Sequence, residues 1–141
     1  LYLLVSLASK YQVGDLVLFC PPDNDAIKLA LDRQYIEHGR CDSQTVPIIK
    51  RIAAIEYDSI SLDASISVNG QLLPGTVILI SDTEGRPLPA YNYQNKRNFV
   101  MPPDTAFLYS DHAPKISFDS RYFGIVPLKN IQGIIKPVWT F

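Results

Sequence analysis

Ser117-Phe118-Asp119-Ser120-Arg121-Tyr122-Phe123-Gly124 is the most unusual run of residues in this chain. It combines two serines, an acid, a base, three aromatic residues and a glycine. A solvent loop rarely carries such bulky aromatics, and a core strand rarely carries an acid and a base so close together. Because buried polar groups need hydrogen-bond partners inside the protein, the run predicts a functional site.

The composition around this run sets the class of protein. A chain of 141 residues with 47% hydrophobic residues is typical of one globular domain and excludes disorder. The net charge of −1 excludes nucleic acid as a partner, since phosphate binding needs clustered Lys and Arg. The two histidines lack metal-ligand spacing, so no metal is expected, and no cofactor is implied. The start at Leu1, without Met, indicates a piece of a longer protein.

Strand patterns dominate the rest of the chain. A helix is predicted from Ala26 to about Ile36, with Asp23 and Asn24 as N-cap candidates and Gly39 marking its end. Asn69-Gly70 is a strong hairpin signal. The strand-like segments are 16–19, 46–55, 59–68, 77–80, 106–109 and 123–126. Residues 82–89 and 91–97 have loop composition. These patterns predict a mainly β fold with one short helix and an excursion between about 59 and 105.

Lys50 lies within the expected strand 46–55, in an apolar setting. Side chains alternate between the faces of a strand, so Lys50 shares a face with Ile48 and Ile52. Burial disfavours the charged amine and lowers its pKa from an ordinary value of about 10.4, which would let it act as a base near neutral pH. The alternative interpretation is a lysine at a sheet edge whose ammonium reaches water.

Three segments together resemble one family. Gly14-Asp15-Leu16-Val17, Lys50-Arg51-Ile52-Ala53-Ala54 and the run 117–124 occur in the order and spacing of bacterial type I signal peptidases. Finer details, such as Phe19-Cys20-Pro21-Pro22 and Gly85-Arg86-Pro87-Leu88-Pro89, resemble the TraF branch, the conjugative-transfer, pilin-processing signal peptidases. The resemblance implies a signal-peptidase/LexA-like β fold with a β-hairpin excursion. A self-cleaving repressor of the LexA kind is a weaker alternative.

The resemblance also implies roles for individual residues. Lys50 matches the general base of a Ser-Lys serine peptidase, and Ser117 matches a hydroxyl that orients the lysine amine. Asp119 and Arg121 match a pair that supports the site structurally. Ser120 is expected to cap local backbone groups. In the same run, Gly124 is expected to permit close packing.

The nucleophile of that family is not found in this chain. It lies in a Ser-x-Pro-type box behind a membrane anchor, and the opening Leu1-Tyr2 resembles the end of that box. Ser6 and Ser9 lack the following proline. We therefore expect residues 1–141 to form a single peptidase catalytic domain without the N-terminal anchor and nucleophile box, inactive as a fragment.

Cys20 and Cys41 are compatible, by themselves, with either a disulfide or two free buried thiols. The resemblance implies a domain on the periplasmic face of the bacterial inner membrane, where a Cys20–Cys41 disulfide persists. It further implies a pilin precursor as substrate, with conjugation-apparatus proteins as further partners. The alternative function is a non-catalytic assembly factor of a secretion or conjugation apparatus with the same fold.

Overall fold

The computed structural model describes residues 2–6, 10–110 and 117–137, with backbone alone for 2–6 and 137. Leu1 and Ser9 lie outside these residues, and the side chain of Ser6 is not described, so the expectations that rest on them stay predictions. The elements are the strands β1 Tyr2–Ser6, β2 Leu16–Phe19, β3 Ile48–Ile55, β4 Ser59–Leu62, β5 Ser65–Val68, β6 Gln71–Val77, β7 Asn98–Val100, β8 Thr105–Tyr109, β9 Val126–Pro127 and β10 Ile131–Pro137, the helices α1 Asp25–Asp32 and α2 Ser120–Phe123, and a 3-10 turn at Leu128–Asn130.

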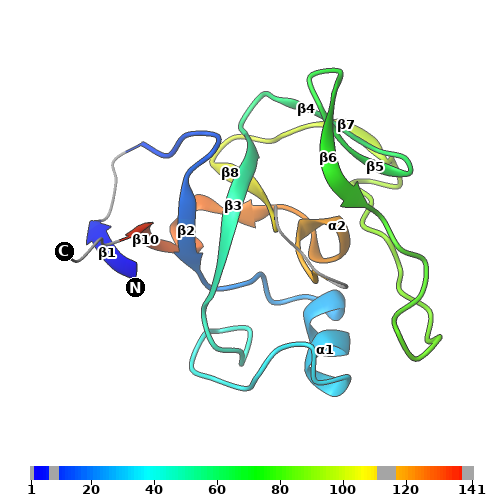
Figure 1. Cartoon of the computed structure of the whole chain (residues 1–141), viewed down its shortest axis with the longest axis horizontal. Coiled ribbons are helices and arrows are strands. Elements are labelled where there is room, and N and C mark those ends of the chain that lie inside the picture. The colour runs from blue at the N-terminus through cyan, green and yellow to red at the C-terminus, as the bar shows by residue number, and fades with distance from the viewer. Residues whose placement is uncertain (1, 7–9, 111–116, 138–141) are drawn as a thin grey trace.

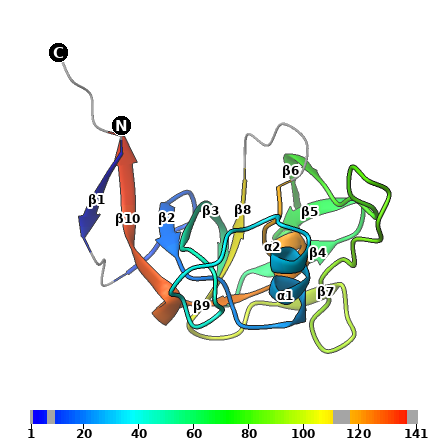
Figure 2. The same cartoon turned by 90° about the horizontal axis from the view of Figure 1, so that it is seen from below.

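Two antiparallel sheets form the framework (Figure 1). The larger has the strand order β1-β10-β2-β3-β8-β9, and the smaller has the order β6-β5-β4-β7. The smaller sheet is the expected excursion, since its strands span 59–100. Figure 2 shows β1 and β10 at one end of the molecule, with the smaller sheet at the other. The mainly β fold expected from the sequence is confirmed.

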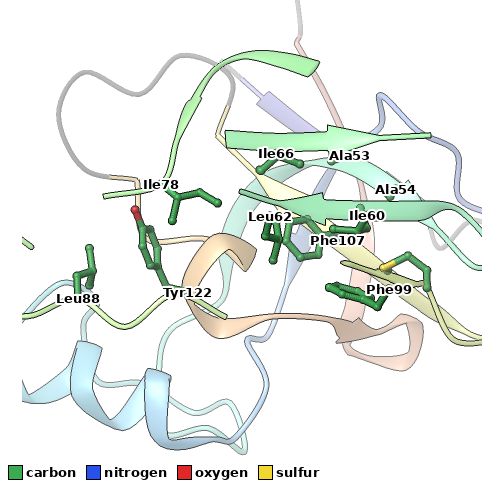
Figure 3. Packing of buried hydrophobic residues seen from close by; sticks show 11 residues of the cluster. Ala53, Ala54, Ile60, Leu62, Ile66, Ile78, Leu88, Phe99, Phe107 and Tyr122 are labelled. Carbon is green, nitrogen blue, oxygen red and sulfur yellow. The ribbon is translucent and has the colours of Figure 1, made fainter. Parts of the chain in front are cut away.

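The central strands separate two hydrophobic cores. On β8, Phe107 packs into a cluster shared with the smaller sheet, whereas Ala106 and Leu108 pack on the other side. This alternation follows from the two-residue period of a strand. Figure 3 shows the first cluster, in which Tyr122 of α2 contributes beside residues of the smaller sheet. Phe123, the next residue, belongs to the second cluster, so α2 lies between the two cores.

The helix α1 starts as expected and ends early. The Asn24 side chain accepts a hydrogen bond from the Ile27 N–H at 3.1 Å, which makes Asn24 the N-cap. The helix ends at Asp32, because Gln34 adopts a left-handed conformation with φ of 62° and the Tyr35 N–H bonds to the Ala30 carbonyl. The predicted end near Ile36, marked by Gly39, was therefore wrong.

Two predicted strands in the excursion need correction. The segment 59–68 is divided into β4 and β5, which pair with each other, and Asn69-Gly70 forms the next hairpin, as expected. The strand predicted at 77–80 is absent there, since β6 ends at Val77. Ile78 turns into the core and Ile80 is exposed. In the apolar run 77–80, Ile78 therefore packs in the core while Ile80 lies on a surface loop.

The disulfide Cys20–Cys41 is present, with the two Cα atoms 5.7 Å apart. It joins the end of β2 to the segment between α1 and β3, so α1 lies inside the closed loop. Among the described residues, no helix has the length and apolar character needed to cross a bilayer.

Candidate active site

The run 117–124 forms a one-turn helix rather than the start of a strand. Asp119 is the N-cap of α2, because its carboxylate accepts the Arg121 backbone N–H at 3.0 Å. The strand predicted at 123–126 is therefore wrong, and only Val126 and Pro127 pair with β8. At Gly124, φ is 83° and a Cβ atom would lie 2.0 Å from the Tyr91 ring. Glycine is required there for both its conformation and its size.

Asp119 and Arg121 form a buried ion pair. The Asp119 residue is 0% exposed, and the Arg121 side chain is 5% exposed. The guanidinium donates two hydrogen bonds to the carboxylate, from Nε at 2.9 Å and from NH2 at 2.8 Å. Its third nitrogen donates to the Val77 carbonyl at 2.9 Å. This bidentate arrangement with a further acceptor satisfies both charges and ties α2 to the end of β6.

The Asp119 carboxylate also holds the residue that contacts Lys50. Its Oδ2 atom accepts the Ser110 backbone N–H at 3.1 Å. The Lys50 ammonium donates to the Ser110 hydroxyl at 3.4 Å, a long hydrogen bond. A chain of contacts therefore runs from Arg121 through Asp119 and Ser110 to Lys50.

Lys50 lies in an internal strand, not at a sheet edge. Its strand β3 pairs with β2, where Lys50 faces Val17, and with β8 on the other side. Burial lowers the pKa of Lys50 from its ordinary value. The negative charge of Asp119 opposes this shift, and the positive charge of Arg121 adds to it. The lowered pKa makes the amine easier to deprotonate, and the deprotonated amine is the form that accepts a proton.

The two serines of the run have different surroundings. Ser120 is fully buried, and its hydroxyl accepts the Leu108 N–H at 2.9 Å, which attaches α2 to β8. Ser117, which precedes Asp119 by two residues, is also buried. Its expected contact with Lys50 stays a prediction.

Sequence patterns had not identified Ser110 as part of the site. Arg51 of β3 pairs with Tyr109, the last residue of β8, and the two strands are antiparallel. The residue before Arg51 and the residue after Tyr109, which are Lys50 and Ser110, therefore lie side by side. The two residues are 60 positions apart in the sequence. A serine that follows a short apolar strand carries no local signal for this pairing.

A pocket of about 360 Å³ is lined in part by Lys50. Its walls come from α1 and the residues after it, from the start of β3 and from the aromatic residues of the run 117–124. It places a mostly apolar surface beside a base, which is an arrangement suited to binding part of a substrate.

Comparisons with known proteins agree with this geometry. A family model described as signal peptidase, peptidase S26, matches residues 1–140. A probable conjugal transfer protein TraF from Sinorhizobium fredii is 32% identical over the whole chain and 71% of its own length. A plasmid transfer protein TraF from Escherichia coli is 36% identical over 91% of this chain and 71% of its own length.

The fold comparison agrees as well. The crystal structure of a signal peptidase I from Enterococcus faecalis superposes with a TM-score of 0.50 and 18% identity, covering 92% of this chain and 98% of that chain. The family model and the sequence relatives span nearly all of the chain, so the resemblance seen in its motifs is confirmed. The chain belongs to the signal peptidase family.

Proposed function

We propose that this chain is the periplasmic domain of a membrane-anchored Ser-Lys serine endopeptidase that processes a pilin precursor in conjugative transfer. The observation that carries the proposal is the half-buried Lys50, whose pKa is lowered by burial and whose ammonium contacts the hydroxyl of Ser110, a residue that donates its backbone N–H to Asp119. The family match supports a peptidase, and the TraF names of the relatives support a role in conjugation.

In the proposed reaction, the neutral Lys50 amine takes the proton of a serine hydroxyl as the serine oxygen attacks the scissile carbonyl. Collapse of the tetrahedral intermediate forms the acyl-enzyme ester and breaks the peptide bond. The Lys50 ammonium gives its proton to the departing amine. Ser110 and Ser117 are proposed to orient the amine, and the nucleophile is proposed to lie upstream of Leu1.

The test is a processing assay with the full-length protein and its substrate, the pilin precursor. Lys50→Ala removes the base, and Lys50→Arg keeps a positive charge that does not deprotonate. Both variants should lower the processing rate by about 10²–10⁴-fold, the usual contribution of general acid-base catalysis. Lys28→Ala is the matched control, because the Lys28 side chain is 69% exposed on α1. Normal processing by both Lys50 variants, with folding retained, would contradict the proposal.

The second candidate is a non-catalytic assembly factor, which the same family fold also permits. Its distinguishing observation is the sequence upstream of Leu1. A hydrophobic span followed by Ser-x-Pro supports the peptidase, and the absence of a serine there supports the assembly factor.

A further inference from the structure

The hairpin turn Asn69-Gly70 joins β5 to β6 at the surface of the smaller sheet. Val68 and Gln71 pair with each other on either side of it, so the turn has two residues. Both turn residues adopt left-handed conformations, with φ of 51° at Asn69 and 83° at Gly70. Both are exposed, and a Cβ atom at Gly70 would meet no atom of another described segment within 4 Å. The side of Gly70 that a side chain would occupy is therefore open space.

The Asn69 side chain is held at both ends of its amide group. Its Oδ1 atom accepts the Ser59 N–H at 2.9 Å, and its Nδ2 atom donates to Oδ1 of Asp58 at 3.0 Å. The other oxygen of Asp58 accepts the Ile55 N–H at 2.9 Å. Asp58 lies between β3 and β4, where the chain passes from the larger sheet to the smaller one (Figure 1). The Asn69 amide therefore ties the β5–β6 hairpin to the connection between the two sheets.

An asparagine followed by glycine can lose its side-chain amide without an enzyme. The Gly70 backbone nitrogen attacks Cγ of Asn69, the bond from Cγ to Nδ2 breaks, and the proton of the Gly70 N–H leaves with Nδ2 as ammonia. Water then opens the resulting succinimide ring at either of its carbonyls. One opening gives an ordinary aspartate and the other gives isoaspartate. The Ser59 N–H lies beside the oxygen on which negative charge develops during the attack, so it supports the first step.

We propose that Asn69 is a site of spontaneous deamidation, and that the new carboxylate releases the hairpin from Asp58. An acid at position 69 cannot donate to Asp58, and the two carboxylates would face each other where the hydrogen bond now lies. Like charges at this distance repel each other. The isoaspartate product also adds a backbone atom to a turn whose flanking residues, Val68 and Gln71, pair directly. This modification does not depend on the proposed peptidase activity.

Mass spectrometry tests the first half of the proposal. The full-length protein is incubated in mildly alkaline buffer and digested with trypsin, which gives one peptide of residues 52–96 because Pro87 blocks cleavage after Arg86. Its three asparagines are Asn69, Asn92 and Asn95, and the last two are followed by bulky residues. Tandem spectra therefore compare the three sites within one peptide.

The conversion should be fastest at Asn69. We expect it to be about 10-fold or more faster there than at Asn92 or Asn95, because a displacement of the attacking nitrogen by about 1 Å can cost up to about 10²-fold. Conversion at Asn92 or Asn95 before Asn69 would overturn the proposal. An intact Asn69 in the folded protein, at a time when the urea-unfolded protein has converted fully, would overturn it as well.

Unfolding in urea tests the second half. Asn69→Asp carries the ordinary deamidation product from the start. It should raise the unfolding equilibrium constant by about 10-fold, since the loss of a hydrogen bond to a charged group shifts this constant by about that factor or more. Asn92→Asp is the matched control, because it makes the same change of amide to acid at another exposed position. The control should leave the unfolding constant unchanged.

An exchange of the two side chains isolates the contact itself. In the Asn69→Asp, Asp58→Asn double variant, the amide at position 58 keeps an oxygen for the Ile55 N–H and offers its NH2 group to the new carboxylate. This variant should recover most of the stability that Asn69→Asp loses. Equal unfolding constants for wild type and Asn69→Asp would overturn the role of Asp58, as would a double variant no more stable than Asn69→Asp.

Discussion

Asp119 and Asp82 are both buried carboxylates bound by arginine, yet they organise the molecule over different distances. Asp119 bonds to Arg121, two residues away, and to the Ser110 N–H. Asp82 bonds to Arg86 and also to Tyr35, 47 residues away. Asp119 holds the backbone of Ser110, whose hydroxyl contacts the Lys50 amine. Asp82 holds Tyr35, which lines the pocket beside Lys50. One type of interaction therefore serves two parts of the same site.

The arginine partners of the two acids differ in their exposure to water. The Arg121 side chain is 5% exposed, whereas the Arg86 side chain is 40% exposed. If Asp82 is removed, Arg86 can turn toward solvent and keep its charge hydrated. Arg121 has no comparable route, because α2 lies between two cores. The contrast teaches that the stability contribution of a buried acid depends on what its partner can do once the acid is gone.

The largest expected effect follows from this contrast. Asp119→Ala leaves a buried, unpaired guanidinium and should lower the free energy of unfolding by about 3–5 kcal/mol. Asp82→Ala should lower it by less, because Arg86 can be hydrated and Arg33, the second arginine beside Asp82, keeps its hydrogen bond to the Pro87 carbonyl. Urea unfolding of both variants measures the difference. Equal decreases in the free energy of unfolding would contradict the predicted difference between the two acids.

The next effect concerns the covalent link on the α1 side of the molecule. The disulfide closes a loop with a sequence separation of 21. Replacing both Cys20 and Cys41 with Ser should lower the free energy of unfolding by about 3 kcal/mol in the chain-entropy model. Urea midpoints of wild type and variant, each with and without reductant, measure it. A wild-type midpoint unmoved by full reduction would contradict the prediction.

A smaller effect is expected at Ser120, on the Asp119 side. Ser120→Ala leaves the buried Leu108 N–H without its acceptor, which should cost about 1–3 kcal/mol. Ser61→Ala is a control, since its hydroxyl bonds are exposed. Amide hydrogen exchange at Leu108 should accelerate in the Ser120 variant alone, and unchanged exchange would contradict the assignment.

The smallest effect is a shift in pH dependence. Asp119 raises the pKa of Lys50 against the effect of burial, so Asp119→Asn should lower that pKa further. A base works when deprotonated, and the loss of kcat/KM on acidification should therefore occur at lower pH in this variant, once circular dichroism shows it to be folded. Asp82→Asn should not move the profile, because Asp82 is not among the charges that act on Lys50. A shift of the pH profile in Asp82→Asn would contradict the prediction, because it would show that the charge of Asp82 also acts on Lys50.

Local patterns predicted much of the fold. The strand Leu16–Phe19, the Asn24 cap and the Asn69-Gly70 hairpin occur where the sequence placed them. The errors have two sources, which are a left-handed turn that the residue types do not signal and contacts between distant segments. The end of α1 depends on the left-handed Gln34, and the run 77–80 leaves its sheet as Ile78 enters the core and Leu79 bonds to the Tyr122 hydroxyl.

By itself, the sequence determined the family and the mainly β architecture, because short motifs and strand patterns are encoded locally. The resemblance to the family implied the Asp119–Arg121 pair, which the structure forms. The tertiary structure alone decided that Ser110 meets Lys50 and that Asp82 holds Tyr35. These partners are 60 and 47 residues apart. Such contacts arise from strand register and from the packing of a loop on a helix, and no short segment of the chain encodes either one.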